Sequence, residues 1–229
     1  MASHRSATTG AQHRNGRMKI AIVGSGRMGT ALGTIWAKCG HDIIFSYARS
    51  DKRLAALAAR LDARWADVAS AVEQADAILL AVHWSRIEDV LSQTGAMTGK
   101  IVLNCCVPLD PSDSRLVLGT DRSGAEYLAE HRPEAAWVGC FNTAPSESFD
   151  AVFARRDRQQ RPQSLCYGDH PEAKRQAKKL IEQVGFDPVD LGDLANARFV
   201  EPFAMVTAVL AYEQTGGPNL TYRFEKLRD

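Results

Sequence analysis

The sequence of 229 residues has few cysteines, almost no net charge and no obvious apolar run long enough to span a bilayer. The five cysteines include no CxxC pair, and no neighbouring histidine completes a zinc pattern. A net charge of +1 argues against a nucleic-acid binder that works by bulk charge. We therefore expect an ordinary globular protein that binds neither metal, nucleic acid nor membrane.

The cysteines have apolar neighbours and an odd count, which indicate reduced thiols and a cytoplasmic protein. Cys105 and Cys106 end a predicted strand, where alternation directs them to opposite faces, so we interpret them as small buried residues. Residues 1–17 are polar, with three arginines and no acid. They lack the apolar core of a secretory signal and are predicted to form a disordered tail, with a short organelle transit peptide as the alternative.

A glycine-rich stretch, residues 24–29, lies between an apolar strand pattern and a helical pattern, which is where a dinucleotide-binding turn is expected. Gly24 permits a sharp turn out of the strand, and Gly26 keeps side chains away from a pyrophosphate. Gly29 lets the helix approach the strand closely. The phosphates would then face free N–H groups at the positive end of the helix.

The next strand favours NADP(H) over NAD(H). An NAD site usually carries an acidic residue at the end of this strand, but here Ser46, Tyr47 and Arg49 follow it, with Lys52 shortly after. Hydroxyl and guanidinium groups attract a 2′-phosphate that a carboxylate would repel. Asp42 and Asp51 stand at the wrong places to bind the ribose. The alternative is a solvated start to the next helix.

Strand and helix patterns alternate along the chain, which predicts an α/β fold with a Rossmann-type doubly wound parallel sheet. The predicted strands are 19–23, 43–45, 64–65, 77–82, 101–105 and 136–141. The predicted helices are 28–39, 52–61, 67–74, 86–91 and 124–131. We assign residues 18–145 to an NADP-binding Rossmann domain.

The pattern changes after Pro145, where an arginine-rich segment, 155–161, is followed by strands at 164–167 and 186–190 and helices at 171–184 and 199–212. The 84 residues 146–229 predict a small C-terminal α/β cap. Such a cap is smaller than the helical substrate domain of hydroxyacid dehydrogenases. The arginines of the segment either attract an anionic substrate or form a solvated loop.

Ligands of a doubly wound sheet gather beyond the carboxyl ends of its strands. Here these ends hold Val82, His83 and Trp84, then Pro108, then Asn142, Thr143 and Ala144. His83 is a candidate general base, although a lone histidine is more often structural. Trp84 either flanks a planar ring or packs on the following helix. Asn142 and Thr143 are candidates to bind a carboxamide or a substrate carbonyl.

No Ser–Lys, Tyr-xxx-Lys or Asp–His arrangement is visible in the sequence. Reduction of an ordinary carbonyl needs a proton donor, whereas transfer of hydride between two planar rings needs mainly stacking and orientation. The sequence therefore favours ring-to-ring transfer, with no certain catalytic residue.

The chain resembles the coenzyme F420-dependent NADP oxidoreductases from residue 18 to about 227. The resemblance rests on residues 24–29, 45–49, 81–84, 142–146, 168–169, 189–194 and 197–201. It implies a homodimer, NADPH on the glycine turn and a deazaflavin stacked on the nicotinamide, with Arg49 and Lys52 on the 2′-phosphate. The predicted cofactor-binding residues are Gly24, Ser25, Gly26, Arg27, Met28, Ser46, Tyr47, Arg49, Lys52, Val82, His83, Trp84, Pro108, Asn142, Thr143 and Ala144.

Three hypotheses remain open from the sequence. The first is an NADPH-dependent oxidoreductase that passes hydride to the deazaflavin coenzyme F420 or a flavin-like acceptor. The second is a reductase of a small carbonyl, an imine or a ferric chelate, and the NADPH domain of STEAP metalloreductases is a second resemblance. The third is a module that senses NADP(H) without turnover.

Overall fold

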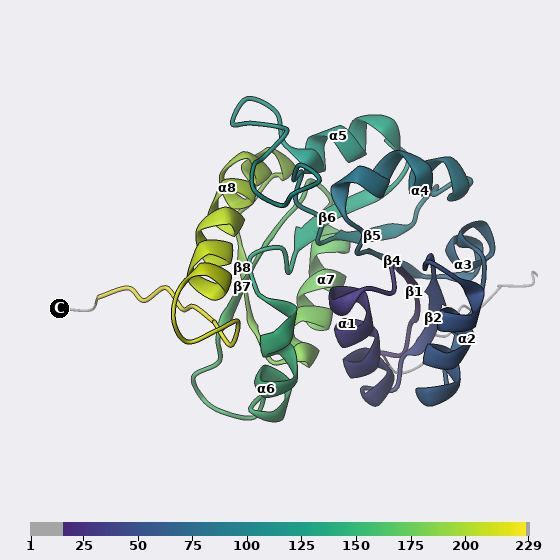
Figure 1. The fold of residues 1–229 in the computed structure, drawn as a ribbon, viewed down its shortest axis with the longest axis horizontal. Coiled ribbons are helices and arrows are strands. Elements are labelled where there is room, and N and C mark those ends of the chain that lie inside the picture. The colour runs from purple at the N-terminus through teal and green to yellow at the C-terminus, as the bar shows by residue number, and fades with distance from the viewer. Residues whose placement is uncertain (1–15, 228–229) are drawn as a thin grey trace, which may run out of the picture.

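The structure is a computed structural model that describes residues 16–227. Its centre is one eight-stranded sheet with the strand order β3-β2-β1-β4-β5-β6-β7-β8 (Figure 1). All neighbouring strands are parallel except β6 and β7. The strands are β1 (Lys19–Val23), β2 (Asp42–Ser46), β3 (Arg64–Trp65), β4 (Ala77–Leu80), β5 (Ile101–Asn104), β6 (Ala136–Cys140), β7 (Gln163–Tyr167) and β8 (Asp187–Asp190).

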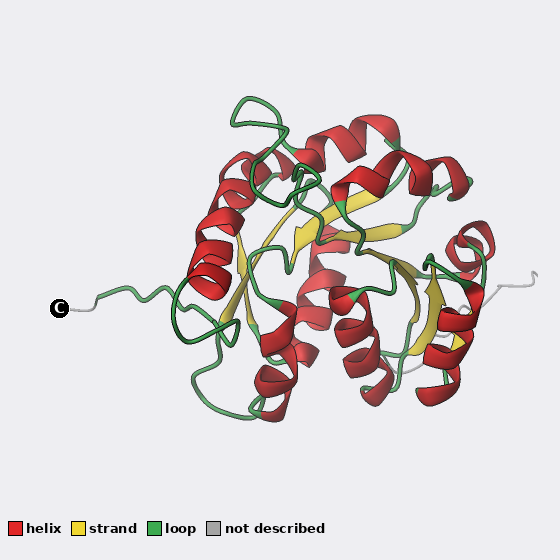
Figure 2. Ribbon diagram, viewed as in Figure 1, coloured by secondary structure: helices red, strands yellow, loops and turns green. Residues whose placement is uncertain are grey.

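Helices cover both faces of this sheet (Figure 2), as the doubly wound prediction requires. The first face is covered by α1 (Arg27–Lys38), α2 (Asp51–Arg60), α6 (Phe149–Ala154) and α7 (Pro171–Val184). The second face is covered by α3 (Val68–Gln74), α4 (Ile87–Gln93), α5 (Gly124–His131) and α8 (Ala197–Ala208).

Strand alternation divides the core into these two layers. Ile20 and Ile22 of β1 pack with α1 and α2, whereas Ala21 and Val23 pack with α3 and α4 on the other face. Both pairs are fully buried, as expected for a strand in the middle of a parallel sheet. The sheet is therefore covered on both faces at the point where β1 ends and the glycine turn begins.

The segment after residue 145 is built into this core. The indole N–H of Trp36 in α1 donates to the carbonyl oxygen of Leu180 in α7 at 3.1 Å. Strand β7 pairs with β6 in the same sheet, with Gly139 opposite Tyr167. A Cβ atom at Gly139 would lie 2.0 Å from the Tyr167 ring, so the close pairing needs glycine there. Whether residues 146–229 form a separate domain stays a prediction, and the tail predicted for 1–17 falls almost wholly outside the described residues.

Most sequence-based element assignments agree with the structure, and the differences are local. Strand β4 ends at Leu80, two residues before the predicted end. The six-residue helix α6 was not predicted, because so short an element carries little periodicity. Helix α8 begins at Ala197 and contains Pro202.

The expectation that no apolar run could span a bilayer is corrected by the helical run Leu194–Glu213. Within the described residues, this run is long and apolar enough to cross a membrane by length and composition alone. In the structure 39% of its apolar window is buried inside the protein. Its inner side packs on the second face of the sheet, and Phe199, Val206 and Leu210 stay exposed.

A buried carboxyl group joins α8 to the beginning of α5. Glu201 is 1% exposed, and its two carboxyl oxygens accept the backbone N–H groups of Gly124 at 2.8 Å and Ala125 at 3.0 Å. These N–H groups have no partner inside their own helix, so the carboxyl group completes the helix end. Burial raises the pKa of Glu201 to about 7, although the two N–H donors oppose the shift.

We predict that Glu201 makes the stability of the protein depend on pH between its ordinary pKa of 4.5 and its folded pKa of about 7. A raised folded pKa gives a contribution that is complete below pH 4.5 and is lost as pH rises through 7. Relative to Glu201→Gln, the free energy of unfolding of the wild type should fall by up to about 3 kcal/mol across this window. Urea denaturation at a series of pH values measures the difference, and parallel profiles would contradict the prediction.

Candidate functional site

The glycine turn between β1 and α1 packs on the end of β4. Gly24 has a φ of 111°. A Cβ atom there would lie 2.2 Å from the carbonyl oxygen of Ala81. A Cβ atom at Gly29 would lie 1.9 Å from the carbonyl oxygen of Gly24. Both glycines are thus required by the protein's own packing.

Gly26 has a different environment. A Cβ atom at this position would meet nothing within 4 Å, and its φ of −74° suits any residue. It is the N-cap of α1, and no side chain caps the helix there. The first backbone N–H groups of the twelve-residue helix α1 are therefore free to bind an anion in the open space above Gly26. This cradle fits a dinucleotide pyrophosphate.

A cavity of about 610 Å³ opens at this point, between the carboxyl ends of β2, β1 and β4. The strand order reverses between β1 and β4, which is the switch point where doubly wound sheets bind ligands. Eight of the predicted cofactor-binding residues line it, namely Gly24, Ser25, Gly26, Arg27, Tyr47, Arg49, Val82 and His83.

Three guanidinium groups surround the part of the cavity beyond β2. Arg49 comes from the loop between β2 and α2, Arg53 comes from the first turn of α2, and Arg86 comes from the 3-10 turn after β4. Among the described residues, none of the three forms an ion pair. Sequence reasoning missed Arg86, which the adjacency of the β1 and β4 ends could have indicated. Lys52 is exposed and is absent from the lining.

Tyr47 fixes the shape of this end of the cavity. It has a φ of 57°, in the left-handed region that a tyrosine rarely adopts, and its hydroxyl group donates to Asp89 of α4. Burial and this acceptor raise the pKa of Tyr47 to about 12, so the phenol stays protonated. Asp89 is the acidic residue in the lining, and it is held by Tyr47 and by the Gln93 amide.

Among the five buried side-chain polar atoms that lack a hydrogen-bond partner within the described part of the chain, two belong to predicted cofactor-binding residues. One is the hydroxyl oxygen of Ser46 at the end of β2, and the other is the amide oxygen of Asn142 after β6. The amide nitrogen of Asn142 donates to the Tyr167 hydroxyl at 2.6 Å. Thr143 shares a 2.6 Å hydrogen bond with the Tyr222 hydroxyl.

The remaining predicted residues are absent from the lining of the cavity. Pro108, Asn142, Thr143 and Ala144 are buried at the ends of β5 and β6. Met28 is half-buried and packs against the first-face core.

His83 is paired with an acid that the sequence did not reveal. Its Nε2 atom lies 3.0 Å from Asp113 Oδ1, and its Nδ1 atom accepts the Ser85 backbone N–H at 3.1 Å. Because Nδ1 accepts, the neutral ring carries its proton on Nε2 and donates it to Asp113. The expectation that the chain holds no Asp–His arrangement is therefore wrong: Asp113 is thirty positions away, in the loop after β5, and only folding brings it to His83.

Trp84 and the adjacent residues Cys105 and Cys106 pack inside the protein and do not face the cavity. The Trp84 ring lies edge-on to Tyr127 of α5 at 5.6 Å, so it packs on a later helix than the sequence suggested and does not line the cavity. Cys105 packs with the first-face core and Cys106 with the second, which confirms their opposite orientation. Burial raises the pKa of both thiols, which leaves them protonated.

Comparison with solved structures supports the fold. A protein provisionally described as an F420-dependent NADP-reductase of Arthrobacter sp. FB24 superposes with a TM-score of 0.81 at 23% identity, over 91% of this chain and 100% of that one. A reductive aminase of Aspergillus terreus, solved with NADPH and ethyl levulinate, gives a TM-score of 0.61 at 20% identity over 85% of this chain and 61% of that one. At these identities the likeness establishes the Rossmann-type fold alone.

Sequence comparison finds relatives among the oxidoreductases. Metalloreductase STEAP3 of Rattus norvegicus is 31% identical over 183 residues, which cover 80% of this chain and 36% of that protein. This chain thus spans about a third of the length of the curated relatives it matches. Residues 19–108, which contain the glycine turn, the end of β2 and the end of β4, match the model of a family described as NADP oxidoreductase, coenzyme F420-dependent. Through this segment, the chain is similar to the coenzyme F420-dependent NADP oxidoreductases.

Proposed function

We propose that this protein is an NADPH-dependent oxidoreductase that transfers hydride between NADP(H) and a planar acceptor, either a deazaflavin such as coenzyme F420 or a flavin. The observation that carries the proposal is the combination of an open helix N-terminus at Gly26 with three guanidinium groups, two after β2 and one after β4, that form no ion pair with any described residue. The pyrophosphate of a dinucleotide fits the first, and a 2′-phosphate fits the second.

The residues of the cleft divide into those that bind and those that orient. The backbone of residues 24–27 would hold the pyrophosphate, and Arg49, Arg53 and Arg86 would hold the 2′-phosphate. Bound NADPH supplies the hydride. Val82 and His83 would set the position of the nicotinamide, and the unpartnered amide oxygen of Asn142 is available to its carboxamide. Placement of the two rings supplies most of the rate in such a site.

A specific observation favours a second candidate, the reduction of a carbonyl or an imine. His83 lines the cleft, and its Nε2 proton is held by Asp113; it would become the proton donor that carbonyl or imine reduction requires once a substrate replaces Asp113 as the partner of Nε2. The metalloreductase relative adds ferric chelates to the acceptors worth testing. Binding of NADPH without oxidation by any acceptor would instead support a sensing module.

We further propose a cytoplasmic homodimer. All five cysteines lie in the described part of the chain and are free thiols, which suits a reducing compartment. The exposed side of α8 and of the π-helical turn that follows it (Val209–Glu213) carries the apolar side chains of Phe199, Val206 and Leu210, which a second copy would cover.

Two alanine substitutions should separate binding from packing in the glycine turn. Gly26→Ala should leave the melting temperature unchanged, because the new Cβ atom meets no protein atom, and should weaken NADPH binding about tenfold or more by occupying the cradle. Gly29→Ala should lower the melting temperature, because its Cβ atom overlaps the carbonyl group of Gly24. Thermal unfolding and calorimetric titration measure both effects. Unchanged NADPH affinity in Gly26→Ala would place the dinucleotide elsewhere.

NADPH should bind at least tenfold more tightly than NADH, and Arg49→Ala should remove most of that preference. A guanidinium–phosphate contact is worth about 1.5–3 kcal/mol, which corresponds to tenfold or more. Lys52→Ala is the matched control, because Lys52 is also a basic residue shortly after β2 but lies outside the cavity lining. Calorimetric titration of each variant with both cofactors gives the comparison. Equal affinities in the wild type would refute the NADP assignment, and a larger loss in Lys52→Ala would move the 2′-phosphate away from Arg49.

The His83→Gln variant distinguishes the two candidate reactions. If hydride passes directly between stacked rings, single-turnover transfer should fall by about 10- to 100-fold, as expected from misplacement. A general acid contributes about 10²–10⁴-fold, so a loss beyond a thousandfold with intact NADPH binding would assign proton donation to His83. Asp113→Asn is the companion variant, because it removes the negative charge beside His83 without changing the lining of the cleft.

A further inference from the structure

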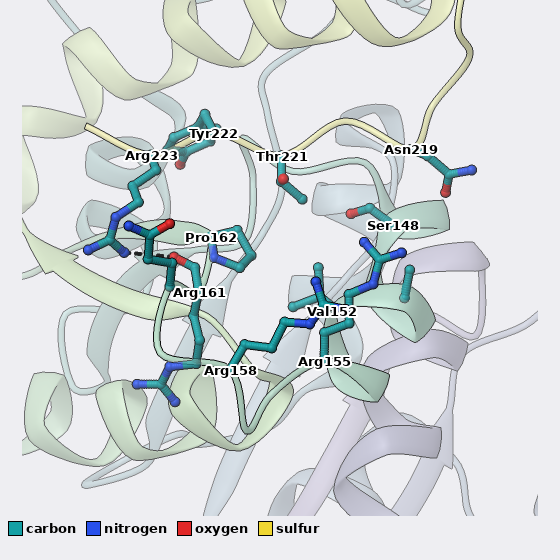
Figure 3. Close-up of a pocket in the computed structure, with 12 residues that line it drawn as sticks. Ser148, Val152, Arg155, Arg158, Arg161, Pro162, Asn219, Thr221, Tyr222 and Arg223 are labelled. Atoms are coloured by element: carbon teal, nitrogen blue, oxygen red, sulfur yellow. Dashed lines mark hydrogen bonds between the residues drawn. The ribbon is translucent and has the colours of Figure 1, made fainter. Parts of the chain in front are cut away.

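A second cavity, of about 530 Å³, shares no lining residue with the dinucleotide cleft. Its walls are the end of α6, the loop that follows it and the C-terminal segment 219–223 (Figure 3). Its volume lies within the usual range for small-molecule sites. The sequence analysis left the arginines of residues 155–161 between an anion site and a solvated loop, and this cavity contains three of them.

The arginines around this cavity differ in how they are neutralised. Arg161 and Arg223 both form ion pairs with Asp187, at 2.6 and 2.8 Å. Arg155 and Arg158 form none with any described residue. Figure 3 shows the side chains of Arg155 and Arg158 reaching toward the space below Thr221. Two uncompensated positive charges therefore face one cavity.

Arg156, from the same run, belongs to the protein's own packing. Its guanidinium group lies over the Phe153 ring, 4.3 Å from the centroid, and donates to the Phe153 carbonyl oxygen. It is absent from the cavity lining. The structure thus separates the arginine run into Arg156, which packs, and Arg155 and Arg158, which are available to a ligand.

The rest of the lining suits a ligand that is partly apolar. Val152, Pro162 and the Tyr222 ring form an apolar wall, and Asn219 and Thr221 add neutral donors. The Ser148 hydroxyl already donates to the Pro145 carbonyl oxygen, so it can only accept. This combination fits a phosphate or a cluster of carboxylates attached to an organic body better than it fits a free inorganic ion.

Tyr222 links this cavity to the end of β6. Its ring lines the cavity, and its hydroxyl group shares the hydrogen bond with Thr143, which lies three residues after the end of β6. Two contacts fix the position of Tyr222 in the cavity wall. Its carbonyl oxygen accepts the Gln163 N–H at 2.9 Å, and the Tyr222 ring packs on Phe203. A molecule whose planar part lies near Thr143 could extend a charged arm past Tyr222.

We propose that this cavity binds the anionic arm of the hydride acceptor, with Arg155 and Arg158 as the residues that contact its phosphate or carboxylate groups. The inference rests on the proposed function, because it assigns the arm to the acceptor of that same reaction. It specifies the acceptor as a planar ring system with an acidic side arm, and it predicts discrimination against the same ring system without that arm.

FMN and riboflavin form a matched pair of probes, since they share one ring system and differ by a terminal phosphate. We expect FMN to bind about tenfold more tightly than riboflavin, measured by flavin fluorescence with NADP⁺ saturating the dinucleotide cleft. The double variant Arg155→Ala/Arg158→Ala should bind both flavins alike, and added salt should weaken FMN binding only where both arginines are present. Arg60→Ala, an exposed arginine at the end of α2 outside both cavities, is the control and should behave as the wild type.

Single-turnover oxidation of NADPH by FMN, riboflavin and F420 separates this inference from the proposed function. Equal binding of the two flavins by the wild type, or unchanged FMN affinity in the double variant, overturns the anion site even if hydride transfer occurs. Arginine-dependent FMN binding without transfer to any of the three acceptors supports the anion site and refutes the proposed function. Arginine-dependent binding together with a KM for FMN that rises in the double variant, at unchanged kcat, supports both.

Discussion

The close approach of α1 to the ends of β1 and β4 is the constraint on which the site depends. It is possible only because Gly24 and Gly29 have no Cβ atoms, which would otherwise overlap the carbonyl groups of Ala81 and Gly24. The approach directs the free N–H groups of α1 into the space between β1 and β4, where the strand order reverses. Helix dipole, open backbone donors and topological switch point therefore coincide.

Local charge, and not net charge, gives the molecule its binding character. The chain as a whole carries a net charge of +1, yet Arg49, Arg53 and Arg86 line one cavity without ion pairs to described residues. Arg155 and Arg158 do the same in the second cavity, where Asp187 has already neutralised their neighbours. Guanidinium groups left unpaired at concave surfaces are well suited to bidentate recognition of phosphate.

The C-terminal segment completes the half of the sheet that faces the expected acceptor. Tyr167 of β7 fits over Gly139 and binds Asn142, and Tyr222 binds Thr143. Phe141 lies between the end of β6 and Asn142. It has a φ of 62°, and its ring packs on Trp36, Phe149 and Phe186. The strained backbone is held in place by aromatic contacts from segments that lie far apart in the sequence.

Local sequence determined the elements and the first half of the site. A strand pattern, three spaced glycines and a helical pattern identify the turn at residues 24–29, because each acts within a few positions of its neighbours. The basic residues after β2 indicated the 2′-phosphate region for the same reason. Tertiary structure decided which of these basic residues face the cavity: Arg49 and Arg53 line it and Lys52 does not. It also added Arg86 from the turn after β4, because the lining depends on where α2 and that turn lie in space. It also brought Asp113 to His83 and Tyr222 to Thr143 across separations of 30 and 79 residues, which local spacing cannot encode.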